Sequence, residues 1–112
     1  MPQPSSAGAP DAQIVEITAG NPAALALRGA LIAETVPALW RHSSRLFGEP
    51  REQMSIDLGG VTEADSAGLA LLVTWAGQAL AANMKLSYAA VPERLLSLAR
   101  ISEVEELLTP AA

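Results

Sequence analysis

The pattern of hydrophobic and polar positions divides the chain into short strands that alternate with helices. Apolar and polar positions alternate at Gln13–Thr18, which is rich in β-branched residues, and again at Ala24–Leu31. Between these two strands lies the turn sequence Ala19-Gly20-Asn21-Pro22. Because so short a connection can only reverse the chain, we expect the two strands to form an antiparallel hairpin.

Helical spacing begins near Thr35, which is a suitable N-cap residue. Pro37 is tolerated in the first turn, and Gly48-Glu49-Pro50 is expected to end the helix. Hydrophobic side chains and one serine recur every three or four positions in between, which predicts one amphipathic helix with a buried stripe of Val36, Leu39, Trp40, Ser43, Leu46 and Phe47.

A third strand is predicted at Met54–Leu58, closed by the turn residues Gly59-Gly60. The next helix, Leu69–Ala82, is apolar on almost every side. One of its faces must pack on the sheet, and the spacing favours Leu69, Leu72, Val73, Ala76 and Leu80 for it. Leu71 and Trp75 then lie outside that face. Either a second layer of the same domain covers them or they form a partner-binding face, since Trp is enriched at interfaces.

The rest of the pattern completes an α/β fold. Lys85–Val91 alternates as a fourth strand, Pro92 opens a helix at its first position, and Ser102 with Glu105 forms a capping box for a short last helix ending near Leu108. Strands separated by helices pair in parallel through right-handed crossovers. We therefore expect one mixed sheet, with an antiparallel N-terminal hairpin followed by βαβα crossovers and helices covering the sheet.

The chain has 112 residues, which is the size of one domain. Residues Met1–Ala12 are rich in Pro, Ser, Gly and Ala and are expected to be a disordered tail without the features of a signal peptide. The folded domain is expected at residues 13–108, with Thr109–Ala112 frayed. The longest apolar stretch is too short and too interrupted to span a bilayer, so no direct membrane insertion is expected.

Composition and charge exclude several kinds of function. The chain has no cysteine, which excludes disulfides, thiolate metal sites and cysteine nucleophiles. Its net charge is -5 with a single lysine, so nucleic acid is not an expected partner. The only histidine is His42, and the sequence contains neither a nucleophile-elbow motif nor a cluster of metal ligands to accompany it. Catalysis or metal binding by His42 is therefore not expected. We expect neither a cofactor, nor a metal, nor enzymatic activity.

The segment Asp65-Ser66-Ala67-Gly68 stands between the third strand and the apolar helix. A hydroxyl at Ser66 can accept a hydrogen bond from an N–H two or three residues later, Asp65 adds negative charge near the positive end of the helix, and Gly68 permits a close backbone approach. These residues can therefore simply form a helix cap. An exposed Ser66 would also be a usable phosphorylation site.

The segment, with its flanking elements, resembles the STAS domain, whose hallmark is a buried strand, a loop and D-[ST]-x-G at the start of a helix. Three features are similar to the small soluble STAS subunit of the Mla phospholipid-transport ABC system. These are Ala38-Leu39-Trp40, the helix sequence from Gly68 to Leu72 with Trp75 one turn on, and the run from Leu95 to Ile101.

This resemblance implies a non-enzymatic adaptor that binds and stabilises or regulates the cytoplasmic ATPase of a bacterial phospholipid transporter, which maintains outer-membrane lipid asymmetry. The chain would be cytoplasmic and held at the inner membrane through the ATPase and, indirectly, the permease. The alternative implied by the same family is an anti-sigma factor antagonist, a phospho-switch acting through Ser66. The residues expected to contact a partner lie in the loop before the motif, in the motif and on its helix: Thr62, Glu63, Asp65, Ser66, Gly68, Leu71 and Trp75.

Overall fold

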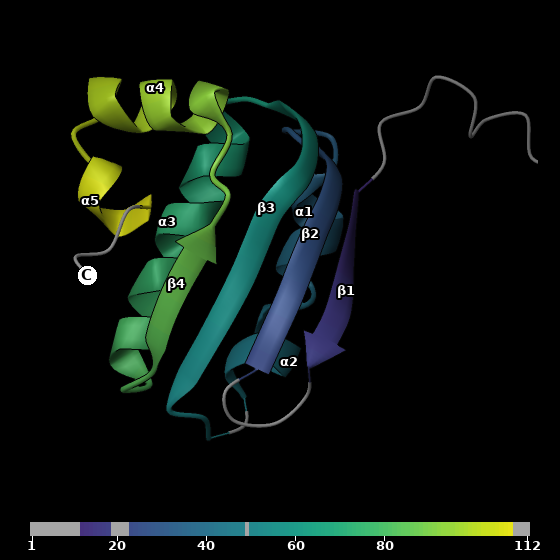
Figure 1. Ribbon diagram of the computed structural model, residues 1–112, viewed down its shortest axis with the longest axis vertical. Helices are drawn as coiled ribbons and strands as arrows, with labels where there is room; N and C mark the ends of the chain where they lie inside the picture. The colour runs from purple at the N-terminus through teal and green to yellow at the C-terminus, as the bar shows by residue number, and fades with distance from the viewer. Residues whose placement is uncertain (1–11, 19–22, 49, 109–112) are drawn as a thin grey trace, which may run out of the picture.

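Four strands form one sheet whose order in space is their order along the chain (Figure 1). The strands β1 (Ala12–Thr18) and β2 (Ala23–Leu31) are antiparallel, and β3 (Gln53–Ala64) and β4 (Lys85–Ala89) continue the sheet in parallel. A computed structural model provides this description for residues 12–18, 23–48 and 50–108. The mixed sheet with its N-terminal hairpin confirms the predicted fold class.

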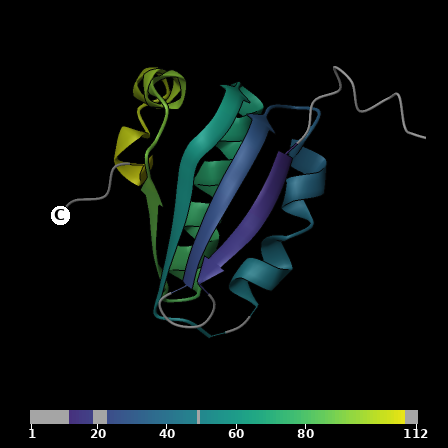
Figure 2. The same ribbon diagram turned by 45° about the vertical axis from the view of Figure 1, so that its right-hand side comes forward.

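Five helices accompany the sheet within these described residues. The helices α1 (Val36–Trp40), α2 (Ser43–Phe47) and α3 (Ser66–Ala81) lie behind the sheet in Figure 1 and leave its other face open, as Figure 2 also shows. The helices α4 (Glu93–Ile101) and α5 (Glu105–Leu108) pack on the opposite flank of α3 from α1 and α2. As a result, α3 is surrounded on three sides.

The hydrophobic core lies between the sheet and α3. In β3 the buried residues alternate, with Met54, Ile56 and Leu58 in the core, as expected for a strand with one covered face. The Tyr88 hydroxyl donates a 2.7 Å hydrogen bond to the Leu72 carbonyl oxygen and joins β4 to α3, and burial raises the pKa of this phenol. The largest fully buried side chains are Trp75, Leu27, Leu31, Leu39, Met54, Ile56, Leu58, Leu72, Leu95 and Leu108.

The structure differs from the predicted N-terminal boundary at one described residue. Ala12, predicted to belong to the tail, is the first residue of β1. The rest of the predicted tail, the turn Ala19–Pro22 and the C-terminal residues 109–112 lie outside the described residues. None of the helices in the described part of the chain has the length and apolar character that crossing a bilayer would require.

The predicted helix from Thr35 to Phe47 is wrong in one respect, because it is two short helices. The His42 N–H bonds the Leu39 carbonyl oxygen at 3.0 Å, a tighter turn than that of an α-helix. The tighter turn changes the rotation per residue and interrupts the stripe, so that Trp40 is 44% exposed. The Thr35 hydroxyl makes no cap bond to α1 and instead donates to backbone oxygens of Ala30 and Ile32.

The predicted end of the third strand at Gly59-Gly60 is also wrong. The strand β3 continues through both glycines to Ala64, so Thr62 and Glu63 belong to its last residues and not to a loop. The pairing of β2 with β3 shifts register between Ala26 and Arg28, beside these glycines. A Cβ at Gly60 would lie 2.8 Å from Cγ of Arg28, so this glycine permits a close approach between strands.

The C-terminal helices differ from the prediction at their ends. Pro92 is the N-cap of α4 and not its first helical residue, and β4 ends at Ala89. The predicted capping box is absent, since Ser102 ends α4 as its C-cap. The Glu105 carboxylate bonds Arg100 Nε at 3.0 Å, which draws it away from a capping role at Ser102.

Candidate functional site

The site forms where β3 passes into α3, and Asp65 is its first residue. Asp65 has extended backbone geometry and is the N-cap of α3, with Oδ1 accepting a 3.0 Å hydrogen bond from the Gly68 N–H. The helix therefore begins at Ser66, three residues earlier than predicted. Asp65, and not Ser66, satisfies one of the free N–H groups at the start of the helix.

Asp65 also joins α3 to the loop between β2 and α1. Its second carboxylate oxygen, Oδ2, accepts from the Ala33 N–H at 3.1 Å, and its own N–H donates to the Leu31 carbonyl oxygen at 3.2 Å. Partial burial acts to raise the pKa of this carboxyl. Hydrogen bonds from the backbone of Gly68, Ala33 and Ala67 and the charge of Arg94 outweigh that effect, so the pKa is lowered from its ordinary value.

Acidification is expected to remove about 1 kcal/mol of stabilisation that Asp65 contributes as a cap. Because its pKa is lower in the folded chain than in the unfolded chain, this contribution is complete above the unfolded pKa and is lost as the pH falls through the folded value. The stabilities of the unmodified chain and of Asp65→Ala, measured by urea unfolding, should therefore differ most at about pH 7, and the difference should shrink as the pH falls below the unfolded pKa. A difference that did not change with pH would contradict this assignment.

Gly68 is buried against the end of β2. A Cβ at this position would overlap the Leu31 carbonyl oxygen and lie 2.9 Å from its carbonyl carbon. Since the obstacle is backbone, it cannot turn away as a flexible side chain could. Gly68 thus has a structural role, as Asp65 does, and neither residue needs a partner to explain its presence.

Ser66 differs from both of its motif neighbours. It is exposed, and within the described part of the chain its hydroxyl has no hydrogen-bond partner. Asp65 and Gly68 thus hold the start of α3 against the end of β2, whereas Ser66 is exposed at the surface. A structural role explains Asp65 and Gly68 but leaves Ser66 without a structural task.

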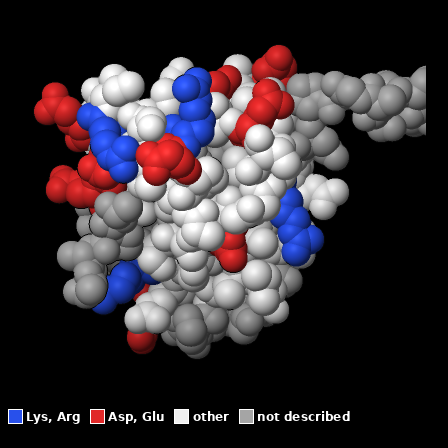
Figure 3. Space-filling model, turned by 45° about the horizontal axis from the view of Figure 1, so that its top comes forward, with Lys and Arg blue, Asp and Glu red and all other residues white. Residues whose placement is uncertain are grey.

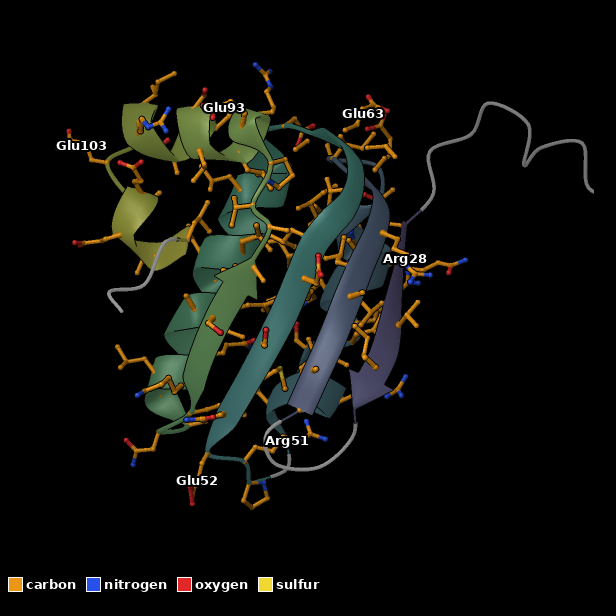
Figure 4. All side chains as sticks on the ribbon, in the orientation of Figure 1. Arg28, Arg51, Glu52, Glu63, Glu93 and Glu103 are labelled. Atoms are coloured by element: carbon orange, nitrogen blue, oxygen red, sulfur yellow. The ribbon has the colours of Figure 1, made fainter. Side chains whose placement is uncertain are left out.

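Charged and polar side chains lie around Ser66. Thr62 and Glu63 are exposed at the end of β3, and Figure 4 shows Glu63 there, at the opposite side of this end from Glu93 and Glu103. Arg94 Nε donates to the Ala64 carbonyl oxygen at 3.4 Å and contributes to a recess of about 270 Å³ with Pro92 and the last residues of β3. Figure 3 shows that acidic and basic groups gather at this end, whereas the open face of the sheet is mostly uncharged.

Leu71 and Trp75, predicted to be part of a partner-binding face, are buried. The Trp75 Nε1–H donates a 2.7 Å hydrogen bond to Oγ of Ser43, and the Trp75 ring lies 6.5 Å from that of Phe47, so α2 covers it. Conversely Leu80, predicted to face the sheet, is 79% exposed. The buried face of α3 is rotated by about a quarter turn from the predicted one.

The outward face of α3 is free of charge along its whole length. No charged residue occurs between Asp65 and Lys85. At 3.6 residues per turn, six exposed residues fall on one face. We call this face the α3 surface, and it consists of Ser66, Ala70, Thr74, Gly77, Leu80 and Ala81.

An apolar groove of about 720 Å³ adjoins the far end of the α3 surface. Trp40, Arg41 and Phe47 line it from the α1–α2 side, and Gln78 and Ala81 line it from α3. Sequence reasoning assigned Trp40 to the core and so missed it as a surface residue. Its place in the regular stripe gave no sign of the tight turn at His42 that exposes it.

Among the described residues there is no group of three or more His, Cys, Asp or Glu side chains placed to hold a metal ion.

Comparisons with known proteins agree with this geometry. A family model described as "Mlab, STAS domain" matches residues 15–109, and the chain therefore belongs to the MlaB-like STAS domain family. The solved structure of the anti-sigma factor antagonist SpoIIAA in its unphosphorylated form is similar, with a TM-score of 0.68 and 14% sequence identity. The match covers 91% of this chain and 89% of that one. No curated protein matches the chain in sequence.

Proposed function

We propose that the chain is a non-enzymatic adaptor that binds the ATPase subunit of a bacterial phospholipid-transport ABC complex and stabilises or regulates it. The observation that carries this proposal is Ser66, which is exposed at the head of α3 and has no structural partner in the described residues. Membership of the MlaB-like STAS family supports this class of partner. The adaptor then works in the cytoplasm, at the inner membrane, through the ATPase and indirectly the permease.

The α3 surface has the character of a protein interface. The 16-residue helix is about 24 Å long and offers neutral, mostly small side chains that let another backbone approach closely. Interface cores are depleted of charged residues and enriched in aromatic ones. The exposed indole of Trp40, at the groove beside the far end of this surface, replaces Trp75 as the aromatic anchor.

A second function, that of an anti-sigma factor antagonist, is favoured by the exposure of Ser66. A kinase could reach this hydroxyl, and a phosphate there would gain from the positive end of α3 while being repelled by Asp65. In this case the partner would be a kinase-type anti-sigma factor. The neutral α3 surface and the Trp40 groove favour the transporter adaptor, since they extend well beyond what modification of one serine requires.

Ser66→Glu is expected to weaken binding of the ATPase by about tenfold, a penalty of about 1.4 kcal/mol. The new side chain adds charge and bulk at the exposed helix start, where the helix dipole tolerates an anion, so the fold should persist. Calorimetric titration with the purified ATPase subunit of a phospholipid-transport ABC complex measures this effect. Ser102→Glu, which adds the same charge to an exposed serine at the end of α4, should bind like the unmodified chain. Equal affinities for all three would place the contact elsewhere.

A further inference from the structure

The loop between β2 and α1 is held against the start of α3 through Asp65. Three contacts make this junction: the Asp65 N–H to Leu31, the Asp65 carboxylate to Ala33, and the close approach of Gly68 to the Leu31 carbonyl. Both hydrogen bonds are made by Asp65, and its carboxylate reaches Ala33, an exposed residue of the loop. Within the loop, the buried Thr35 hydroxyl bonds the backbone of Ala30 and Ile32 and fixes the chain on either side.

Ser66 and the loop are consequently neighbours on the surface, although more than thirty positions separate them in the sequence. Ser66 follows Asp65 directly, with consecutive Cα atoms about 3.8 Å apart. The Ala33 nitrogen lies 3.1 Å from the Asp65 carboxylate. Ala33 and Glu34 are exposed, like Ser66, and Glu34 makes no ion pair within the described residues.

We infer that the partner-binding surface is composite, with Ala33 and Glu34 as a second segment beside Ser66, and that Asp65 is the positioning residue that holds the two segments together. A specific interface covers about 800 Å² on each partner, which as a round patch has a radius of about 16 Å. A partner seated over Ser66 therefore also covers the loop. This inference rests on the proposed function and specifies the surface that the ATPase recognises.

The exposed carboxylate of Glu34 also indicates what that part of the partner presents. With Glu63 at the end of β3, it gives two exposed acidic groups on segments that flank Asp65. A lysine or arginine on the ATPase would complement them, and rim charges of this kind act mainly on the association rate and its dependence on salt. The neutral α3 surface needs no charged group on the partner. Added salt should therefore weaken the contacts of Glu34 and Glu63 more than the contacts of the α3 surface.

The first test measures the junction in the free chain by amide hydrogen exchange. Asp65→Asn leaves one acceptor oxygen for two N–H donors, so exchange at Ala33 or at Gly68 should accelerate by about tenfold or more while the core remains protected. Asp57→Asn is the matched control, because Asp57 is an exposed aspartate of β3 that also accepts a backbone hydrogen bond, from Gly59 at 2.7 Å. Unchanged exchange at both Ala33 and Gly68 in Asp65→Asn would overturn the positioning role.

The second test measures association of the purified ATPase with Glu34→Lys, Asp65→Asn and Asp57→Asn. The first two should bind about tenfold more weakly, and Asp57→Asn should bind like the unmodified chain. Added salt should weaken binding of the unmodified chain more than binding of Glu34→Lys. If Ser66→Glu weakens binding but Glu34→Lys and Asp65→Asn do not, the composite surface is wrong and the proposed function stands. If the unmodified chain does not bind the ATPase, the proposed function fails and the composite surface fails with it.

Discussion

Gly68→Ala is expected to destabilise the domain by about 3 kcal/mol or more, a large part of the roughly 5–15 kcal/mol that stabilises a typical domain. The added methyl group would overlap the Leu31 carbonyl oxygen, and relief requires α3 to move away from β2. Such a movement would also stretch the hydrogen bonds of Asp65 to Leu31 and Ala33. Urea unfolding followed by far-UV circular dichroism measures the loss.

The matched control for this prediction lies on the same helix. At Gly77 a Cβ would meet nothing within 4 Å, so Gly77→Ala tests helix propensity without a clash. Alanine is favoured over glycine in a helix interior by about 1 kcal/mol, and this variant should be at least as stable as the unmodified chain. Similar stabilities for the Gly68→Ala and Gly77→Ala variants would contradict the contact between α3 and β2.

Substitutions of the two tryptophans are expected to affect different properties. Trp75→Ala should mainly lower the stability of the domain, and Trp40→Ala should mainly lower its affinity for the ATPase. Trp75→Ala should cost about 3–5 kcal/mol of stability, because it empties a fully buried site. It also leaves the buried Ser43 hydroxyl without the Trp75 indole N–H. Trp40→Ala should cost about 1 kcal/mol of stability, since almost half of that side chain is already exposed. Trp40→Ala should also weaken ATPase binding by about 2 kcal/mol, as loss of an aromatic interface anchor does.

Thermal melting and calorimetric titration of the two variants check this separation. The Trp75→Ala variant should melt far below the unmodified chain, whereas the Trp40→Ala variant should melt close to it and lose affinity. If a Trp40→Ala variant bound the ATPase at full affinity, the apolar groove lined by Trp40 would not be part of the interface. A Trp75→Ala variant of native stability would contradict the packing of α2 on α3.

The sequence predicted the order of strands and helices because alternation and helical spacing are local signals. It misplaced the end of β3 because glycine is typical of turns, whereas Gly60 permits Arg28 of the neighbouring strand to approach closely. It missed the break between α1 and α2 because the hydrophobic stripe continues across His42. The first error depends on a residue that lies far away in the sequence, and the second depends on a single backbone turn. Neither feature produces a repeating pattern of hydrophobic and polar residues.

The sequence placed the motif between a strand and a helix but did not assign the structural roles of its residues, and its partner-binding role stays a prediction. The motif Asp65–Gly68 does begin a helix at the end of a strand, yet its spacing cannot reveal which residue caps the helix. The face of α3 could not be chosen from a helix that is apolar all round, because burial there depends on α1, α2, α4 and α5 packing on its flanks. Ala33 and Glu34 carry no motif, and only the fold brings them beside Ser66.

The most direct test of the adaptor role is photo-crosslinking in living cells from a reactive amino acid placed at Ala70, an exposed residue of the α3 surface one turn after Ser66. A matched probe at Ala89 lies exposed at the end of β4. Ala70 should crosslink to the ATPase subunit of a phospholipid-transport ABC complex, and Ala89 should not. Crosslinking of Ala70 to a kinase-type anti-sigma factor, or of the ATPase to Ala89 alone, would contradict the adaptor role.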